Sequence, residues 1–311
     1  MPNGRVILSS ACCATALCLG GVIGPPGAAL ALLALPLPAL VVGAMGGTSH
    51  AALSSLAAGG LVGGLLGWPA GVAFVALAGA PAVLTVLLLR RAWCLESIVA
   101  LAVLAMALGG LLLALSAAPD PRTWQDAIEA TWRSSFDAAI QMYRDLGTPT
   151  ERLAEIELAR DQVAHRVALL LPSLAVIGGA GVWLGNLGIS RRWAHWPQLD
   201  SLSRWRNADW VIWGLIGSGF AMFLPAESVA AVSANVFLIA LACYFAQGLA
   251  IVSYFFQRFS LPRGLRVATY VVIGLQQIAA ALVVALGVFD LWGDFRHLAR
   301  PADVAVGQDS E

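Results

Sequence analysis

Two amides inside a strongly apolar run are the residues whose chemistry stands out. The run NVFLIALACYFAQGLAIVSYFF, residues 235–256, holds Asn235 near one end and Gln247 near its middle. Tyr244 precedes Gln247 by about one helical turn and Tyr254 follows it by two, so these three share a helix face. Lipid offers no hydrogen-bond partner, so such groups must face other helices or a wet cavity.

A second amide pair, Gln276 and Gln277, lies in the last apolar run. We therefore expect a polar pocket between the last three runs that hydrogen-bonds a small polar solute. The residues expected to line it are Asn235, Tyr244, Gln247, Tyr254, Gln276 and Gln277. The alternative is that the amides hold helices together, at ~1 kcal/mol per hydrogen bond. Asn235 and Gln247 are far enough apart along the helix to meet different neighbours at different depths.

The composition requires a membrane environment. The 311 residues are 59% hydrophobic and 12% charged, with a mean hydropathy of +0.80. A soluble domain has about a quarter of its residues charged, so this chain has too few charges to cover a water-facing surface. The net charge of zero argues against nucleic acid as a partner. The chain has no lysine, which excludes Schiff-base and P-loop lysine chemistry.

Runs of about 20 apolar residues predict membrane-spanning helices. We place them at residues 6–24, 28–46, 50–67, 70–90, 97–117, 166–188, 209–225, 228–256 and 267–290. Pro36 and Pro38 should break the second span, because each removes a helical hydrogen bond. The first span is interpreted as uncleaved, with a removable signal peptide as the alternative. The predicted fold class is all-α: a polytopic transmembrane bundle of eight or nine spans in a bacterial inner membrane.

Residues 119–165 differ from the rest of the chain, because apolar residues recur there at helical spacing among many charges. Asp120-Pro121 favours a helix start, Gly147 a helix end, and the capping box from Thr148 a second helix that continues into the span at 166. We expect an amphipathic helical hairpin between the fifth and sixth spans. It would serve as a lid or docking element, or simply lie on the membrane surface or the bundle.

These features divide the chain into four regions. They are Gly/Ala-rich transmembrane helices (1–118), the extramembrane hairpin (119–165), C-terminal transmembrane helices (166–300) and a disordered tail (301–311). Gly59, Gly63 and Gly67 repeat every four residues in the first region, which allows close helix packing. Such a face would pack internally, or bind a second copy or another membrane protein.

The segment 189–213 holds five of the eleven tryptophans together with four arginines. This composition is typical of an interfacial belt, with rings at headgroup depth and arginines near lipid phosphates. The residues expected in the belt are Arg191, Arg192, Trp193, Trp196, Arg204, Trp205 and Arg206. The more specific alternative is that this segment binds an anionic lipid or a phosphate ligand. With nine spans and the N-terminus inside, most arginines fall on the cytoplasmic side, but Arg296 and Arg300 fall outside, against the positive-inside rule.

Residues for catalysis or metal binding are not evident in the sequence. The spans contain no nucleophile–base pair, phosphate loop or paired carboxylates, and the five cysteines lack zinc spacing. Glu96, Glu227 and Asp290 lie at the ends of spans rather than at mid-membrane. We therefore expect no catalytic activity, no cofactor and no metal.

The C-terminal third resembles the YybS-like family of bacterial multi-pass membrane proteins. The resemblance over residues 165–300 rests on Asn235, Gln247-Gly248, Gly287-Val288-Phe289-Asp290, Trp292, Asp294 and Arg296, preceded by Trp205 and Trp210. That family has no assigned activity, but it is similar to the solute-binding S components of energy-coupling-factor vitamin transporters. We expect a solute-binding or transport-related component, with membrane lipids and a membrane protein or second copy as partners. The alternative is a non-catalytic scaffold or assembly factor that binds a protein through residues 119–165.

Overall fold

Every regular element in the described part of the chain is a helix, as the composition predicted. The computed structural model describes residues 4–22, 33–117, 121–147, 150–193, 196 and 202–296. The first helices are α1 (Gly4–Val22), α3 (Leu37–Gly46), α4 (Thr48–Leu66), α5 (Trp68–Phe74), η1 (Val75–Gly79), α6 (Ala80–Arg90) and α7 (Leu95–Ala117). They are followed by α8 (Pro121–Asp145), α9 (Thr150–Ser190), η2 (Leu202–Arg204), α11 (Val211–Ala221), α12 (Glu227–Arg258), α13 (Arg263–Leu275) and α14 (Gln277–Gly293).

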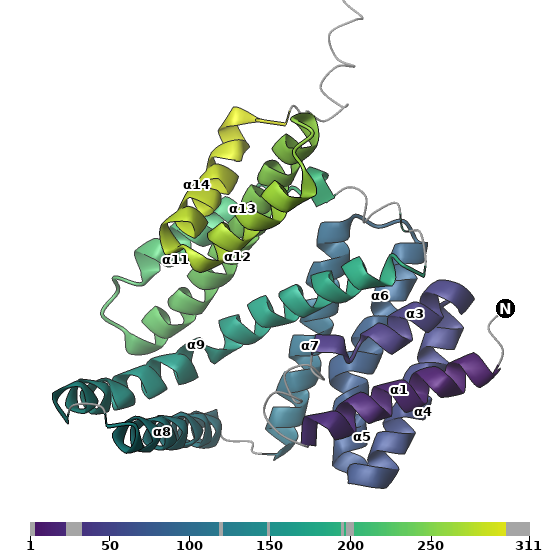
Figure 1. Cartoon of the computed structure of the whole chain (residues 1–311), viewed down its shortest axis with the longest axis horizontal. Coiled ribbons are helices and arrows are strands. Elements are labelled where there is room, and N and C mark those ends of the chain that lie inside the picture. The colour runs from purple at the N-terminus through teal and green to yellow at the C-terminus, as the bar shows by residue number, and fades with distance from the viewer. Residues whose placement is uncertain are drawn as a thin grey trace, which may run out of the picture.

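The helices α1 and α3 to α7 form one bundle, drawn in purple and blue in Figure 1. Its main core contains Val86 of α6 and Ile98 of α7, both fully buried, and Trp183 of α9 packs into the same core. The predicted break inside the second span is confirmed, because a turn at residues 35–36 separates the helical residues 33–34 from α3. The break follows from the two prolines there, which cannot donate helical hydrogen bonds.

The helices α11 to α14 form a second bundle, drawn in green and yellow in Figure 1. The helices α12 and α14 cross at Gly248 and Gly287. A side-chain carbon on Gly248 would collide with the carbonyl oxygen of Val283, and one on Gly287 with the carbonyl oxygen of Tyr244. Only glycine permits this approach of two helix backbones.

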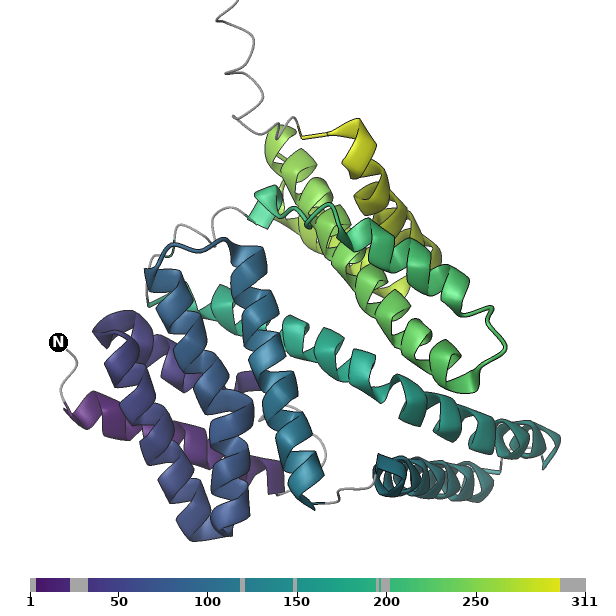
Figure 2. The same ribbon diagram turned by 180° about the vertical axis from the view of Figure 1, so that it is seen from behind.

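The 41-residue helix α9 runs between the two bundles (Figures 1 and 2). It packs against α3 and α7 of the first bundle and against α12 of the second. The prediction that the second hairpin helix continues without a break into the span at 166 is confirmed. This helix therefore connects the polar region around α8 to both apolar bundles.

The helix α8 lies beside the first part of α9 (Figures 1 and 2). It ends before Gly147, whose φ of 79° stops the helix as the sequence predicted. Ion pairs join the two helices: Arg133–Asp161 at 3.1 Å, Arg144–Glu157 at 3.2 Å and Arg160–Asp137 at 2.6 Å. The predicted capping residues Thr148 and Pro149, and the predicted tail 301–311, lie outside the described residues. The position of this pair outside the membrane stays a prediction.

Five helical stretches are long and apolar enough to cross a membrane, or six if the bent pair α13–α14 counts as one span. They are Thr48–Leu66, Trp68–Arg90, Leu95–Ala117, Leu153–Ser190 and Glu227–Arg258. The shorter apolar helices Gly4–Leu19, Leu37–Gly46 and Val211–Ala221 coincide with three further predicted spans. The chain therefore has five or six candidate spans among its described residues, and the predicted eight or nine are not confirmed.

The last predicted span is not one continuous helix. The sequence predicted a helix over 267–290, but α13 ends at Leu275 and α14 begins at Gln277, with a bend of 102° between them. Gln276 adopts an extended conformation, with φ −102° and ψ 110°. Its position just after Gly274, a residue of low helix propensity, favours a helix end at this point.

The bend also brings Arg296 to the same end of the second bundle as residues of the predicted belt. The C-terminal end of α14 lies at the same end of the second bundle as the connection between α12 and α13 (Figures 1 and 2). Arg296 there contacts the backbone of Ser203 and Trp205, in the predicted belt. Because the bent pair returns the chain to the side from which it came, Arg296 lies with the other arginines of the belt rather than across from them.

Candidate functional site

Asn235 bonds to the turn of the neighbouring helix α9 that contains a proline. Pro172 lies inside α9 and lacks the N–H group that a helix interior requires. The Asn235 Oδ1 atom accepts a hydrogen bond from the backbone N–H of Ser173 at 2.9 Å, and its Nδ2 atom donates to the carbonyl of Leu169 at 2.8 Å. Ser173 and Leu169 are four residues apart, the spacing of a helical hydrogen bond. The Asn235 amide therefore bridges the N–H group and the carbonyl group of the turn that contains Pro172.

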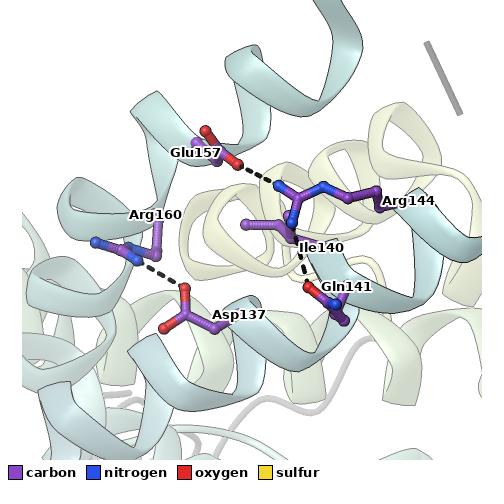
Figure 3. Close-up of a pocket in the computed structure, with 6 residues that line it drawn as sticks. All are labelled: Asp137, Ile140, Gln141, Arg144, Glu157 and Arg160. Carbon is purple, nitrogen blue, oxygen red and sulfur yellow. Dashed lines mark hydrogen bonds and ion pairs between the residues drawn. The ribbon is translucent and has the colours of Figure 1, made fainter. Parts of the chain in front are cut away.

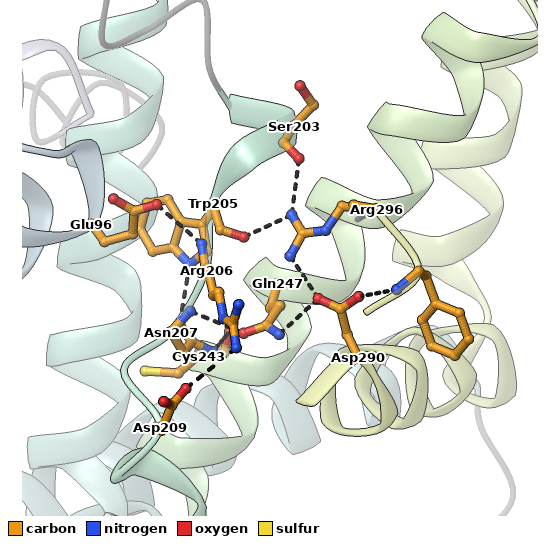
Figure 4. Close-up of polar contacts among 11 residues, drawn as sticks. Glu96, Ser203, Trp205, Arg206, Asn207, Asp209, Cys243, Gln247, Asp290 and Arg296 are labelled. Carbon is orange, nitrogen blue, oxygen red and sulfur yellow. Dashed lines mark hydrogen bonds and ion pairs between the residues drawn. The ribbon is translucent and has the colours of Figure 1, made fainter. Parts of the chain in front are cut away.

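Gln247 is also bonded at both ends of its amide, and only 1% of it is exposed. Its Oε1 atom accepts a hydrogen bond from the backbone N–H of Asn207 at 3.0 Å, and its Nε2 atom donates to Asp290 Oδ2 at 3.1 Å (Figure 4). The glycine crossing of α12 and α14 makes this contact possible, because it brings the two helix backbones close together. Gln247 therefore joins α12 to α14 and to the segment that precedes α11.

Asp290 and Arg296 form a buried ion pair, with Arg296 Nη2 2.7 Å from Asp290 Oδ2. The side chains are 4% and 0% exposed, respectively. A left-handed turn at Asp294, with φ 34°, reverses the chain after α14 so that Arg296 comes back to Asp290. The backbone N–H of Phe295 donates to Asp290 Oδ1 at 3.1 Å. A buried ion pair needs such additional hydrogen bonds to offset the cost of removing both charges from water.

The segment from Ser203 to Asn207 is held by the same network. Arg296 Nη1 donates to the carbonyls of Ser203 and Trp205, at 2.9 and 2.8 Å. The Asn207 side chain donates to the carbonyl of Cys243 at 2.8 Å. The backbone N–H of Arg206 donates to Glu96 at the start of α7, at 3.1 Å (Figure 4). We call Glu96, Asn207, Gln247, Asp290 and Arg296 the polar clasp, since together they connect the first bundle to the second.

The structure does not bring the six expected pocket residues together. Twelve residues separate Asn235 from Gln247 on one helix, about 18 Å along its axis. Tyr244 is fully buried, and its hydroxyl has no hydrogen-bond partner among the described residues. Tyr254 makes an edge contact with the ring of Phe255, at 5.5 Å between centroids.

Gln276 and Gln277 are both exposed, at the break between α13 and α14. The hydrogen bonds of the Asn235 and Gln247 amides go to other residues and not to Gln276 or Gln277. The exposed apolar residues Leu275 and Ile278, at 82% and 75%, flank them. The two polar residues at the break between α13 and α14 are thus flanked by exposed apolar residues.

The expected belt divides into an exposed and a buried part. Arg191, Arg192, Trp193 and Arg204 are exposed. Trp205 instead packs in the main core at 8% exposed, and Trp196 packs against the same core. Arg206 is half-buried and pairs with Asp209 at 3.6 Å.

A cavity of about 240 Å³ lies between α8 and α9 (Figure 3). Its lining residues are Asp137, Ile140, Gln141, Arg144, Glu157 and Arg160. The two arginines are already paired with Asp137 and Glu157, and Arg144 also donates to Gln141 at 3.2 Å. Because these charges neutralise one another, the cavity offers a ligand little net charge.

Metal-binding clusters of three or more His, Cys, Asp or Glu side chains are absent from the part of the chain that the structure describes. The polar clasp holds no nucleophile with an adjacent base, and its carboxylates accept hydrogen bonds from within the chain. Its geometry is suited to holding helices together rather than to proton transfer or nucleophilic chemistry.

The Asp290–Arg296 pair was missed by the reasoning from residue types, which placed Asp290 at a span end without a partner. A signal was present in the sequence, since the pattern behind the family resemblance contains Gln247-Gly248, Gly287, Asp290 and Arg296. These are the residues that meet at the crossing of α12 and α14. Asn207 had no comparable signal.

The chain matches a family model described as "Predicted membrane protein (DUF2232)" over residues 12–291. It therefore belongs to this family of membrane proteins. No curated protein and no solved structure gives a significant match. These comparisons do not show the expected YybS-like relationship or the similarity to transporter S components.

Proposed function

We propose that this member of the DUF2232 family is a non-catalytic scaffold of the bacterial inner membrane, which binds a protein partner through α8 and the first part of α9. The observation that carries the proposal is that the Asn235 and Gln247 amides of α12 are already hydrogen-bonded within the chain. Asn235 and Gln247 are each bonded inside the chain through both the oxygen and the nitrogen of the amide. Their role as internal bonds removes the main reason to expect a solute between them.

The surface of α8 and α9 supports this assignment. Three ion pairs brace the two helices, so the pair presents a defined surface. Large apolar side chains are exposed on this otherwise polar surface, with Met142 at 53%, Leu146 at 73% and Leu158 at 80%. Large exposed apolar side chains on a polar surface support a protein-binding role where they lie close enough to form one patch.

Crosslinking in living cells tests the proposal. A photoactivatable amino acid at Leu158 should give a discrete adduct with one protein, and deletion of residues 121–147 should abolish that adduct. The matched control is the same amino acid at Leu112 of α7, which is 68% exposed in an apolar helix and should crosslink to lipid. Protein adducts from neither position, or an adduct that survives the deletion, would argue against a scaffold.

A solute-binding or transport-related component is the second candidate, and the break between α13 and α14 favours it. Backbone breaks at membrane depth are tolerated where they face protein or a water-filled cavity, and broken helices often line solute sites in transporters. Native mass spectrometry of the protein, released gently from its membranes, tests this role. A stoichiometric small molecule that is lost in Gln276→Leu/Gln277→Leu would support transport. If only lipid is bound, the result would favour the scaffold role instead.

A further inference from the structure

Two groups of arginines differ in how their charge is balanced. Arg133, Arg144 and Arg160, on α8 and α9, each pair with a carboxylate of the chain. Another five arginines are exposed and form no ion pair with a carboxylate of the described residues: Arg91, Arg192, Arg204, Arg258 and Arg263. The second group therefore carries uncompensated positive charge at the protein surface.

These five arginines come from distant parts of the sequence but lie on one side of the molecule. They follow or end α6, α9 and α12, belong to η2, or begin α13. Figures 1 and 2 show these helix ends along the same side, away from α8. We call this set the arginine face. Arg5, Arg90 and Arg166 are also exposed without a carboxylate partner. Arg90 donates to the carbonyls of Gly43 and Ala44, and the other two belong to α1 and to the middle of α9.

Exposed aromatic rings accompany the arginine face. Trp93 is 44% exposed and follows α6, and Trp193 is 51% exposed and follows α9. Trp210 and Phe259, at 73% and 66%, lie before α11 and after α12. Tryptophan rings prefer the headgroup layer of a membrane, where one part of the ring is apolar and the other is hydrated.

We propose that the arginine face binds the phosphates of anionic phospholipid headgroups, and that the protein prefers an anionic leaflet on this side. The arginines are spread over five segments, so they match a layer of headgroups rather than a single phosphate ion. Guanidinium groups bind phosphate oxygens through paired N–H donors, and rings beside them enter the same layer. This proposal is independent of the scaffold role.

Thermal unfolding of the full chain in neutral detergent tests the proposal. The probes are phosphatidylglycerol, phosphatidylcholine and inorganic phosphate, each titrated into the purified protein. We expect phosphatidylglycerol to raise the unfolding temperature at a lower concentration than phosphatidylcholine. The half-saturating concentration of phosphatidylglycerol should rise by about fivefold for each arginine removed, from the usual attraction of one basic residue to an anionic membrane surface.

The decisive variant is Arg91→Gln/Arg192→Gln/Arg204→Gln, with Arg5→Gln/Arg166→Gln as the matched control. The first should lose the preference for phosphatidylglycerol and the second should keep it. The proposal is overturned if both lipids act alike, if the triple variant keeps the preference, or if inorganic phosphate reproduces the effect. Should the triple variant not fold, a salt series on the unmodified protein decides. A preference that persists at 1 M salt, where charges are screened beyond about 3 Å, would overturn it.

Discussion

The hydrogen bonds between Asn235 and the turn of α9 at Pro172 lead to a quantitative prediction. Replacing Asn235 by Leu removes two hydrogen bonds to α9, at 2.8 and 2.9 Å, and one to the carbonyl of Ala231 in its own helix. Hydrogen bonds between membrane helices stabilise by about 0.6–2 kcal/mol each. We therefore expect the variant to lose about 2 kcal/mol of unfolding free energy.

A double-mutant cycle with Pro172 tests the same prediction more specifically. In Pro172→Ala, the N–H of Ser173 can bond the carbonyl of Leu169 within the helix, and the Asn235 amide loses its two partners. In that background Asn235→Leu should cost at least about 1 kcal/mol less than in the unmodified protein. The cycle thus measures whether the stabilisation by Asn235 depends on the presence of Pro172.

Reversible unfolding in mixed detergent micelles, followed by circular dichroism, supplies the four free energies. The matched control is Gln257→Leu, an exposed amide at the end of the same helix, which should change the unfolding free energy by less than about 0.5 kcal/mol. If the effects of Asn235→Leu and Pro172→Ala add within about 0.5 kcal/mol, the bridging role is refuted. A cost for Gln257→Leu as large as that for Asn235→Leu would show only a general effect of amide removal.

Three further changes test the second bundle. Asp290→Asn leaves its buried arginine partner uncompensated, so we expect a loss of about 3–5 kcal/mol in the same unfolding assay; a loss under 1 kcal/mol would contradict a buried pair. Gly287→Ala places a carbon against the α12 backbone and should cost about 1–3 kcal/mol, whereas Gly264→Ala, with nothing within 4 Å, should cost little; equal costs would contradict the close crossing. In a cysteine-free background, Phe259→Cys and Trp292→Cys should react with a membrane-impermeant thiol reagent from the same side of the membrane; labelling from opposite sides would restore a continuous last span.

Several predictions that depended on local pattern agree with the structure, although the continuous helix predicted over 267–290 does not. The limits of α12 follow from the length of its apolar run, and the end of α8 follows from Gly147. The break before α3 follows from prolines. In each case the cause lies within a few residues of the effect, because propensity, capping and backbone hydrogen bonding act over about one helical turn.

The expected polar pocket depended instead on distant contacts. Residue types indicated that Asn235 and Gln247 must find partners, but not which ones. The partner of Asn235 lies 62 residues away at Ser173, and that of Gln247 lies 43 residues away at Asp290. Gln276 has the same side chain as Gln247 and yet lies exposed, because the backbone bends at that residue. The identity of a buried residue's neighbours is set by how helices cross, which periodicity does not encode.

The sequence by itself determined that this protein is an all-helical membrane protein with several apolar helices, since so few charges cannot cover a water-facing surface. Only the tertiary structure decided that Asp290 and Arg296 are buried together, because a left-handed turn and two glycines at a helix crossing must first bring their segments into contact. It also decided which arginines have no carboxylate partner, because an ion pair requires a short distance between two opposite charges, and composition does not specify that distance.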